Sequence, residues 1–196
     1  MGRPRKTNVR RDASGKSRGE EGIHPETLTA RERRLREAGV PLTFRKMEMT
    51  KLGWREVTKR TATDRMSGFT LGILRLRGKA DPGGISEEQF NAGDGFCRIV
   101  HQHAAVMGYR LSVPSPSLML MGLGGSSHED DAEQIARVRR RFQRCFDALM
   151  EVSRTHSKRV WQVTYGVCVE NWSPGQLSGE DYGSLRVGLN ALRKVV

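Results

Sequence analysis

The clearest pattern of apolar positions along the chain lies between residues 86 and 108. Small or apolar side chains recur there every three or four residues, which is typical of one buried stripe on a helix of about six turns. They are Phe90, Gly93, Cys97, Val100, Ala104 and Met107. Ser86 and Gln89 have the spacing of a capping box, and Gly108 marks the end. The pattern predicts a capped helix that packs in a core or an oligomer.

A second amphipathic helix is expected from Ser127, an N-cap candidate followed by acidic residues at 129–131. Its apolar stripe comprises Ile135, Val138, Phe142, Cys145, Leu149 and Val152. Much of its remaining surface is basic, with Arg137, Arg139, Arg140, Arg141 and Arg144. We therefore expect a long helix with one apolar and one arginine-rich side.

Two shorter helices are predicted near the ends of the chain. Residues 27–38 contain good helix formers, with Thr27 or Thr29 as the N-cap and with Gly39 and Pro41 as stop signals. Ser178 precedes a last helix from Gly179 to about Val195, with three leucines, at 185, 189 and 192, on one face.

Three segments have weaker patterns. Residues 50–66 favour a helix, although the apolar side chains there are sparse. Residues 68–78 fit both a strand and a short buried helix, and we favour the helix. Residues 160–169 alternate like a strand, but a short buried helix fits their place between two helices. Either conformation is compatible with a mainly α fold.

The predicted domain organisation has four parts. Residues 1–22 are rich in basic side chains and glycine and poor in apolar ones, so we expect a disordered arm. A helical domain follows over 23–110. Proline, glycine and serine at 111–127 predict a linker, and 128–196 form a C-terminal helical region.

The charge of the chain points to a polyanionic partner. Lys and Arg number 34 against 22 Asp and Glu, a formal charge of +12 among 196 residues. Residues 1–65 hold 18 basic and 9 acidic side chains, so three quarters of the excess lies in the first third. This imbalance favours nucleic acid as the partner, and the N-terminal motif described below makes double-stranded DNA the expected one.

Composition also limits the compartment. Cys97, Cys145 and Cys168 are odd in number and widely spaced, and no secretory signal opens the chain. We expect reduced, buried thiols in a cytoplasmic protein. The apolar runs are shorter than the ~20 residues of a bilayer span, so no membrane crossing is expected.

The first residues resemble a known DNA-binding element. Gly2-Arg3-Pro4, followed by Arg5 and Lys6, is similar to the core of an AT-hook, which lies extended in the minor groove of A·T-rich DNA. Proline favours an extended backbone, and arginine is attracted to a narrow groove. Phosphate binding by charge alone and a solubilising tail are the two alternatives. The candidate contacts in this arm are Arg3, Arg5, Lys6, Arg10, Arg11, Lys16 and Arg18.

A second candidate contact surface is the arginine cluster on the predicted helix after Ser127. Arg137, Arg140, Arg141 and Arg144 could present guanidinium groups to phosphates along one side of the helix. The alternative is a solvated helix face whose charge is partly balanced by the acidic residues at 129–133.

Nothing in the chain indicates catalysis, a metal or a cofactor. His101 and His103 would point to different sides of a helix, and Cys97 with His101 supplies only two ligands. The glycines at 122–125 lack the Lys-Ser/Thr of a phosphate loop. The tryptophans 54, 161 and 172 are expected to be core anchors rather than base-stacking residues. We expect no enzyme and no cofactor.

The opening GRPRK and the architecture together resemble small terminase subunits of phages and prophages. That resemblance implies a helical, oligomeric protein that binds viral DNA for packaging, with DNA at the basic N-terminal region and a ring built by the Ser86 helix or later helices. An architectural role on DNA is closely related. Two alternatives are a transcriptional regulator with a helix-turn-helix within residues 27–108, and a protein-interaction or RNA-associated adaptor.

Overall fold

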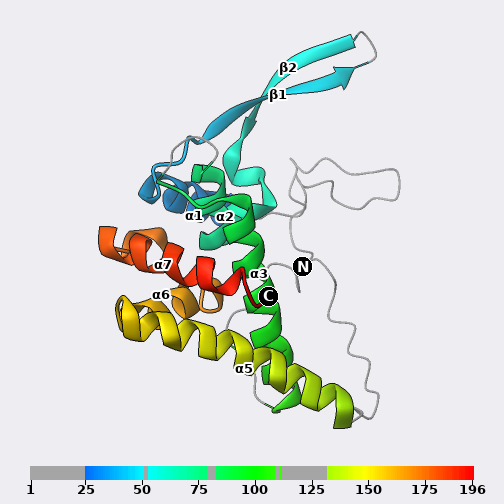
Figure 1. Cartoon of the computed structure of the whole chain (residues 1–196). Helices are drawn as coiled ribbons and strands as arrows, with labels where there is room; N and C mark the ends of the chain where they lie inside the picture. The colour runs from blue at the N-terminus through cyan, green and yellow to red at the C-terminus, as the bar shows by residue number, and fades with distance from the viewer. Residues whose placement is uncertain (1–24, 51–52, 79–82, 109–110, 112–131) are drawn as a thin grey trace, which may run out of the picture.

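The computed structural model describes residues 25–50, 53–78, 83–108, 111 and 132–196. The mainly helical fold predicted from the sequence is confirmed, with one two-stranded sheet in addition (Figure 1). In chain order the elements are α1 (Pro25–Glu37), β1 (Thr43–Thr50), β2 (Gly53–Arg60), the 3-10 turns η1 (Thr61–Thr63) and η2 (Arg65–Gly68), α2 (Thr70–Gly78), α3 (Glu87–Val106), α5 (Ala132–Thr155), α6 (Arg159–Cys168), the 3-10 turn η3 (Pro174–Gln176) and α7 (Gly179–Leu192).

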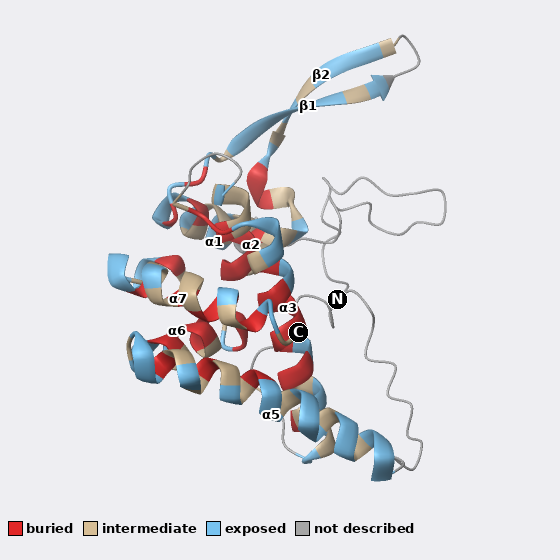
Figure 2. Cartoon of the chain, in the orientation of Figure 1, coloured by how far each residue is buried: buried red, intermediate tan, exposed pale blue. Residues whose placement is uncertain are grey.

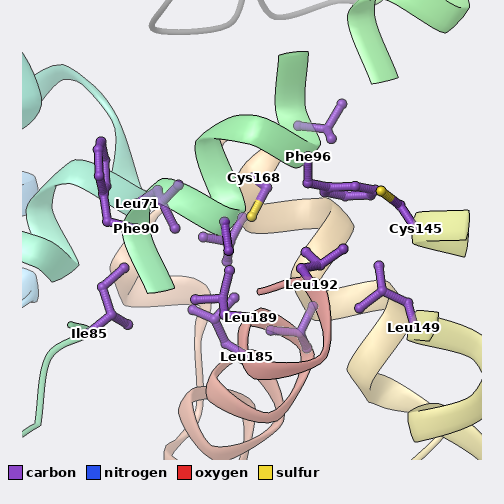
Figure 3. Packing of buried hydrophobic residues seen from close by; sticks show 14 of the residues in the cluster. Leu71, Ile85, Phe90, Phe96, Cys145, Leu149, Cys168, Leu185, Leu189 and Leu192 are labelled. Atoms are coloured by element: carbon purple, nitrogen blue, oxygen red, sulfur yellow. The ribbon is translucent and has the colours of Figure 1, made fainter. Parts of the chain in front are cut away.

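The main core is built around α3, which lies along the helical body (Figures 1 and 2). Phe96 of α3 is fully buried, and its ring lies among side chains of the C-terminal helices, including Cys145 and Leu192 (Figure 3). Other members of this cluster come from α2, α6 and α7. The described helices on both sides of residues 112–131 therefore share one core.

A smaller core fixes the base of the β-hairpin. Leu35 and Ala38 at the end of α1 pack with Val40, Ala62 and Ile73, all of them buried. The backbone N–H of Thr61 donates to the carbonyl of Leu42 (2.8 Å), which closes the hairpin above this cluster. The β1–β2 hairpin is therefore anchored to the helical body at its base.

The prediction of a helix over residues 50–66 is wrong. Residues 43–60 form an antiparallel hairpin in which Thr43 pairs with Arg60 and Thr50 with Gly53, and η1 and η2 follow it. Gly53 has a φ of 112°, a conformation that β-carbon sterics disfavour for other residues. Both faces of the ribbon are largely exposed (Figure 2), so burial imposes no period-two apolar pattern on its sequence.

The helix predicted from Ser86 is confirmed in detail. The Ser86 Oγ accepts from the Gln89 N–H (3.2 Å), and the Gln89 Oε1 accepts from the Ser86 N–H (3.0 Å), which completes the capping box. The chain leaves the helix at Gly108 with a φ of 76°. Because α3 is buried on several sides, its role is core packing.

Two ambiguous segments are helices. Residues 70–78 form α2, as we favoured. Residues 159–168 form α6, in which Val160, Val163 and Val167 are buried at spacings of three and four. The alternating pattern there was compatible with both structures, and packing between α5 and α7 decides for the helix.

The remaining helices match their predicted segments apart from the N-cap of α1. The helix α1 begins at Pro25, so Thr27 and Thr29 lie inside it rather than at its cap. Ser178 caps α7, whose Leu185, Leu189 and Leu192 are fully buried. The α5 helix begins at Ala132, and the expected cap at Ser127 lies outside the described residues.

The α7 cap contains a buried carboxylate whose ionisation stabilises the fold. Asp181 is 2% exposed, accepts from the N–H and hydroxyl of Ser178 (2.9 and 2.8 Å) and pairs with Arg159 (2.9 Å). Burial acts to raise the pKa of Asp181, but the hydrogen bonds from Ser178 and the charge of Arg159 outweigh it and lower that pKa. The unfolded chain therefore binds this proton more readily than the folded chain does.

We expect Asp181→Asn to lower the free energy of unfolding at neutral pH by about 1–3 kcal/mol. In the wild type this stabilisation is present above the ordinary carboxyl pKa and is lost as the pH falls through the lowered one. Urea titrations over a series of pH values measure both effects, with Glu180→Gln as the exposed control. A variant whose stability falls with acid in parallel with the wild type would contradict this role.

Candidate nucleic-acid interface

Four of the predicted contact residues lie together on α5. Arg137, Arg140, Arg141 and Arg144 follow one another at spacings of three, one and three, so they share one side of the helix. All four are exposed, and together with Gln143 they line an open depression of the surface. The structure therefore brings this part of the predicted interface into one patch, which we call the α5 arginine face.

Most of the charge on the α5 arginine face has no ion-pair partner among the described residues. Arg137 lies 3.6 Å from Glu133, one helical turn earlier. Arg140, Arg141 and Arg144 form no ion pair with any carboxylate of the described part of the chain. The acidic residues 129–131, which the sequence suggested as counter-charges, lie outside the described residues.

The field of these guanidinium groups reaches the core beside them. Burial raises the pKa of the Cys145 thiol, while the positive charges of Arg144 and Arg141 act in the opposite direction. Two cations that favour an anion on an adjacent, buried side chain will also favour an anion at the surface, where approach is open.

The opposite side of α5 is held rigidly against the core. Cys145 and Leu149 are fully buried. The Phe142 ring stacks on His103 of α3, with centroids 4.1 Å apart, and the Phe146 ring meets Trp161 edge-on at 5.0 Å. The arginine side is thereby fixed toward solvent.

Arg139 is separated from the α5 arginine face by its position on the helix. Its Nη2 lies 3.4 Å from the sulfur of Met107, at the end of α3. Burial and then the charge of Arg139 lower the pKa of His103. This arginine therefore contributes to the α3–α5 contact.

The predicted contacts of the N-terminal arm lie outside the described residues. These are Arg3, Arg5, Lys6, Arg10, Arg11, Lys16 and Arg18. Their role in binding stays a prediction.

Sequence reasoning missed a second basic surface, on the β1–β2 hairpin. Its strands carry Arg45, Lys46, Arg55, Lys59 and Arg60. The segment was expected to be partly helical, so these residues were not grouped. Gly53, between a run with Thr and Phe at 43–50 and a run with Trp, Val and Thr at 54–60, was the available signal for a hairpin.

Other basic residues near the N-terminus serve the fold. The Nη1 atoms of Arg31 and Arg34 donate to the carbonyls of Ala62 (3.3 Å) and Gly68 (3.2 Å). Burial is the main cause that lowers the pKa of each guanidinium. These two arginines tie α1 to the 3-10 turns and are poorly placed to meet a ligand.

The cysteines considered as metal ligands are buried, whereas the tryptophans considered for base stacking differ in exposure. Cys97, Cys145 and Cys168 are buried free thiols, and the described residues include no group of three His, Cys, Asp or Glu that could hold a metal. Trp161 packs against the main core, as expected. The expectation is wrong for Trp54, which is 67% exposed on the hairpin.

Within the described ranges, no helix has the length and apolar character needed to cross a bilayer. Comparisons with protein-family models, with curated proteins and with solved structures found no match to this chain.

Proposed function

We propose that this protein binds double-stranded DNA through phosphate contacts made by the α5 arginine face and by the basic residues 1–22. The observation that carries the proposal is the exposed set Arg140, Arg141 and Arg144, which form no ion pair within the described residues. Guanidinium groups without protein partners can form forked hydrogen bonds to phosphate and release condensed counterions from DNA.

The dimensions of the α5 arginine face suit a phosphate backbone. Seven residues separate Arg137 from Arg144, a rise of about 10 Å along the helix. One strand of a duplex carries a phosphate about every 3.4 Å of its axis, so this rise spans roughly three phosphates. The four side chains can therefore neutralise neighbouring charges on one strand.

The same face offers little for reading base sequence. Its amide side chain, Gln143, donates to the Asp147 carboxylate (2.8 Å) and is engaged within the helix. Arginine contacts to phosphates position a protein without selecting a sequence. The proposed binding is therefore largely independent of DNA sequence.

Two of the helices within residues 27–108, α2 and α3, favour this function over a helix-turn-helix regulator. A recognition helix needs an exposed face with donors for base edges. The α2 helix buries residues 70–74, and α3 begins with two glutamates and buries much of its surface. Neither helix presents such a face.

The narrower form of the proposal is an oligomeric DNA-packaging or architectural protein of the phage small-terminase type, acting in the cytoplasm without catalysis. Three free, buried thiols support a reducing compartment. Light scattering of the purified chain tests the assembly: a ring-sized particle is expected, and a monomer would contradict the terminase form while leaving DNA binding intact.

We expect the triple variant Arg140→Gln, Arg141→Gln, Arg144→Gln to bind a labelled duplex more weakly at every salt concentration. The slope of log affinity against log salt should become shallower by roughly 2 to 3, because up to three phosphate contacts are lost. Fluorescence anisotropy with a duplex of mixed sequence measures both quantities, and single-stranded RNA as a competitor tests the RNA-associated alternative.

The matched control removes three arginines that are paired with carboxylates elsewhere. Arg33, Arg98 and Arg193 lie 3.7, 3.2 and 3.1 Å from Glu37, Asp94 and Glu88. Their replacement by glutamine lowers the net charge equally. Equal losses of affinity and slope in both triple variants would show that total charge acts and that the α5 arginine face has no special role.

A further inference from the structure

The β1–β2 hairpin extends away from the helical body (Figures 1 and 2). Each strand has eight residues, and the pairing runs without interruption from Thr43–Arg60 to Thr50–Gly53. At about 3.4 Å per residue, the ribbon is roughly 24 Å long. It is therefore long enough to lie along a groove of a nucleic acid without contact from the helical body.

One face of the ribbon carries large apolar side chains in water. Cross-strand partners lie on the same face, so Met49 lies beside Trp54, and Met47 is the next position inward on β1. Met47, Met49 and Trp54 are 53%, 75% and 67% exposed. This apolar cluster lies toward the far end of the ribbon, beyond the reach of both cores of the body.

Basic side chains lie on both faces of the ribbon: Arg45 and Arg60 share the face of this cluster, and Lys46, Arg55 and Lys59 lie on the opposite face. Arg45 lies 3.6 Å from Glu56, and Lys59 forms an ion pair with Glu48. Lys46, Arg55 and Arg60 form no ion pair among the residues that the structure describes. The ribbon therefore combines a surplus of positive charge with a small apolar end.

We propose that this ribbon enters a groove of duplex DNA, where Met49 and Trp54 contact the bases and the basic side chains contact the flanking phosphates. The proposal rests on the function proposed above and adds a second contact surface to it. A two-stranded ribbon fits a DNA groove, and apolar side chains that enter a groove can wedge between base steps and unstack them.

Charge and size favour DNA over the other occupants of such a ribbon. The basic residues extend over the whole length of the ribbon, as a duplex with phosphates on both sides of its groove requires. Three apolar side chains are a small anchor for a bilayer. A second copy of the chain would bring the same positive surplus against itself, which repels.

The test compares two hairpin variants of the full chain. The double variant Met49→Ala, Trp54→Ala should bind a mixed-sequence duplex about tenfold to a hundredfold more weakly, with an unchanged salt slope, because stacking is lost and charge is kept. The triple variant Lys46→Gln, Arg55→Gln, Arg60→Gln should make the slope shallower by roughly 2 to 3. Met107→Ala, at an exposed methionine of the helical body, is the control.

A measurement on the unaltered hairpin does not depend on how these variants fold. Titration of the wild type with a duplex should quench the Trp54 fluorescence, identified as the part of the signal that Trp54→Phe removes. A duplex with 2-aminopurine at each step should brighten where the wedge unstacks the bases. Persistence of Trp54 emission at saturating DNA, with wild-type affinity in the double variant, would overturn the proposal.

The other outcomes of these measurements distinguish failure of the hairpin proposal from failure of the proposed DNA binding on which it rests. Wild-type chain that ignores the duplex contradicts both proposals. Binding that the α5 triple variant weakens and the hairpin variants leave unchanged contradicts the hairpin alone. If phosphatidylserine vesicles quench Trp54 and DNA does not, the hairpin proposal is overturned in favour of a membrane. If the double variant shifts from dimer to monomer without losing DNA affinity, it is overturned in favour of a second copy of the chain.

Discussion

Removal of residues 1–22 should weaken binding of the chain to duplex DNA by roughly a hundredfold or more at about 150 mM salt. This segment holds seven basic and three acidic side chains among its 22 residues. If each basic residue neutralises one phosphate, the slope of log affinity against log salt falls in magnitude by about 6. Anisotropy titrations of the full and shortened chains at four salt concentrations measure the change.

Duplexes of different composition separate the two modes proposed for this arm. An arm that binds as an AT-hook does should lose more affinity for A·T-rich than for G·C-rich DNA on truncation, because the narrow minor groove of A-tracts attracts arginine. An arm that acts by charge alone should lose the same for both. Affinity and slope that survive truncation unchanged would rule out a role of the arm in binding.

Phe96→Ala should lower the free energy of unfolding by about 3–5 kcal/mol. Phe96 is fully buried in the middle of α3, and its ring lies edge-on to Trp161 with centroids 6.3 Å apart (Figure 3 shows its neighbours in the cluster). Truncation removes the ring from a site enclosed by helices on both sides of residues 112–131, so the cavity cannot close without moving several elements. Guanidinium titration followed by far-UV circular dichroism measures the loss.

A second phenylalanine provides the comparison for this core. Phe44 is 39% exposed on β1, and Phe44→Ala should cost much less than Phe96→Ala. A single cooperative transition for both variants is expected if the described helices form one unit. A loss below about 1 kcal/mol for Phe96→Ala, or separate transitions for its two flanking regions, would contradict the shared core.

The parts of the fold that local signals determine could be predicted from the sequence. A serine followed three residues later by a polar side chain that can reach back specifies a helix start within one turn, as at Ser86 and Ser178. The apolar stripe of α5 likewise requires only its own spacing. The arginine cluster followed directly, because once one side of a helix is buried the opposite side must face water.

The hairpin could not be recognised in this way because neither of its faces is buried. Strand prediction depends on a period-two pattern that burial selects, and residues 43–60 extend beyond both cores. The exposure of Trp54 follows from the same geometry. The inward role of Arg31 and Arg34 depends on carbonyls about 30 residues away, which local sequence does not reveal.

The most direct test of the account is the affinity of the intact chain for a mixed-sequence duplex, measured from dilute buffer to about 300 mM salt. Binding should be tight in dilute buffer, and log affinity should fall linearly with log salt, with a slope that counts the phosphates neutralised. Failure to bind DNA in dilute buffer, where charge attraction is strongest, or an affinity that does not change with salt, would contradict the proposed DNA binding.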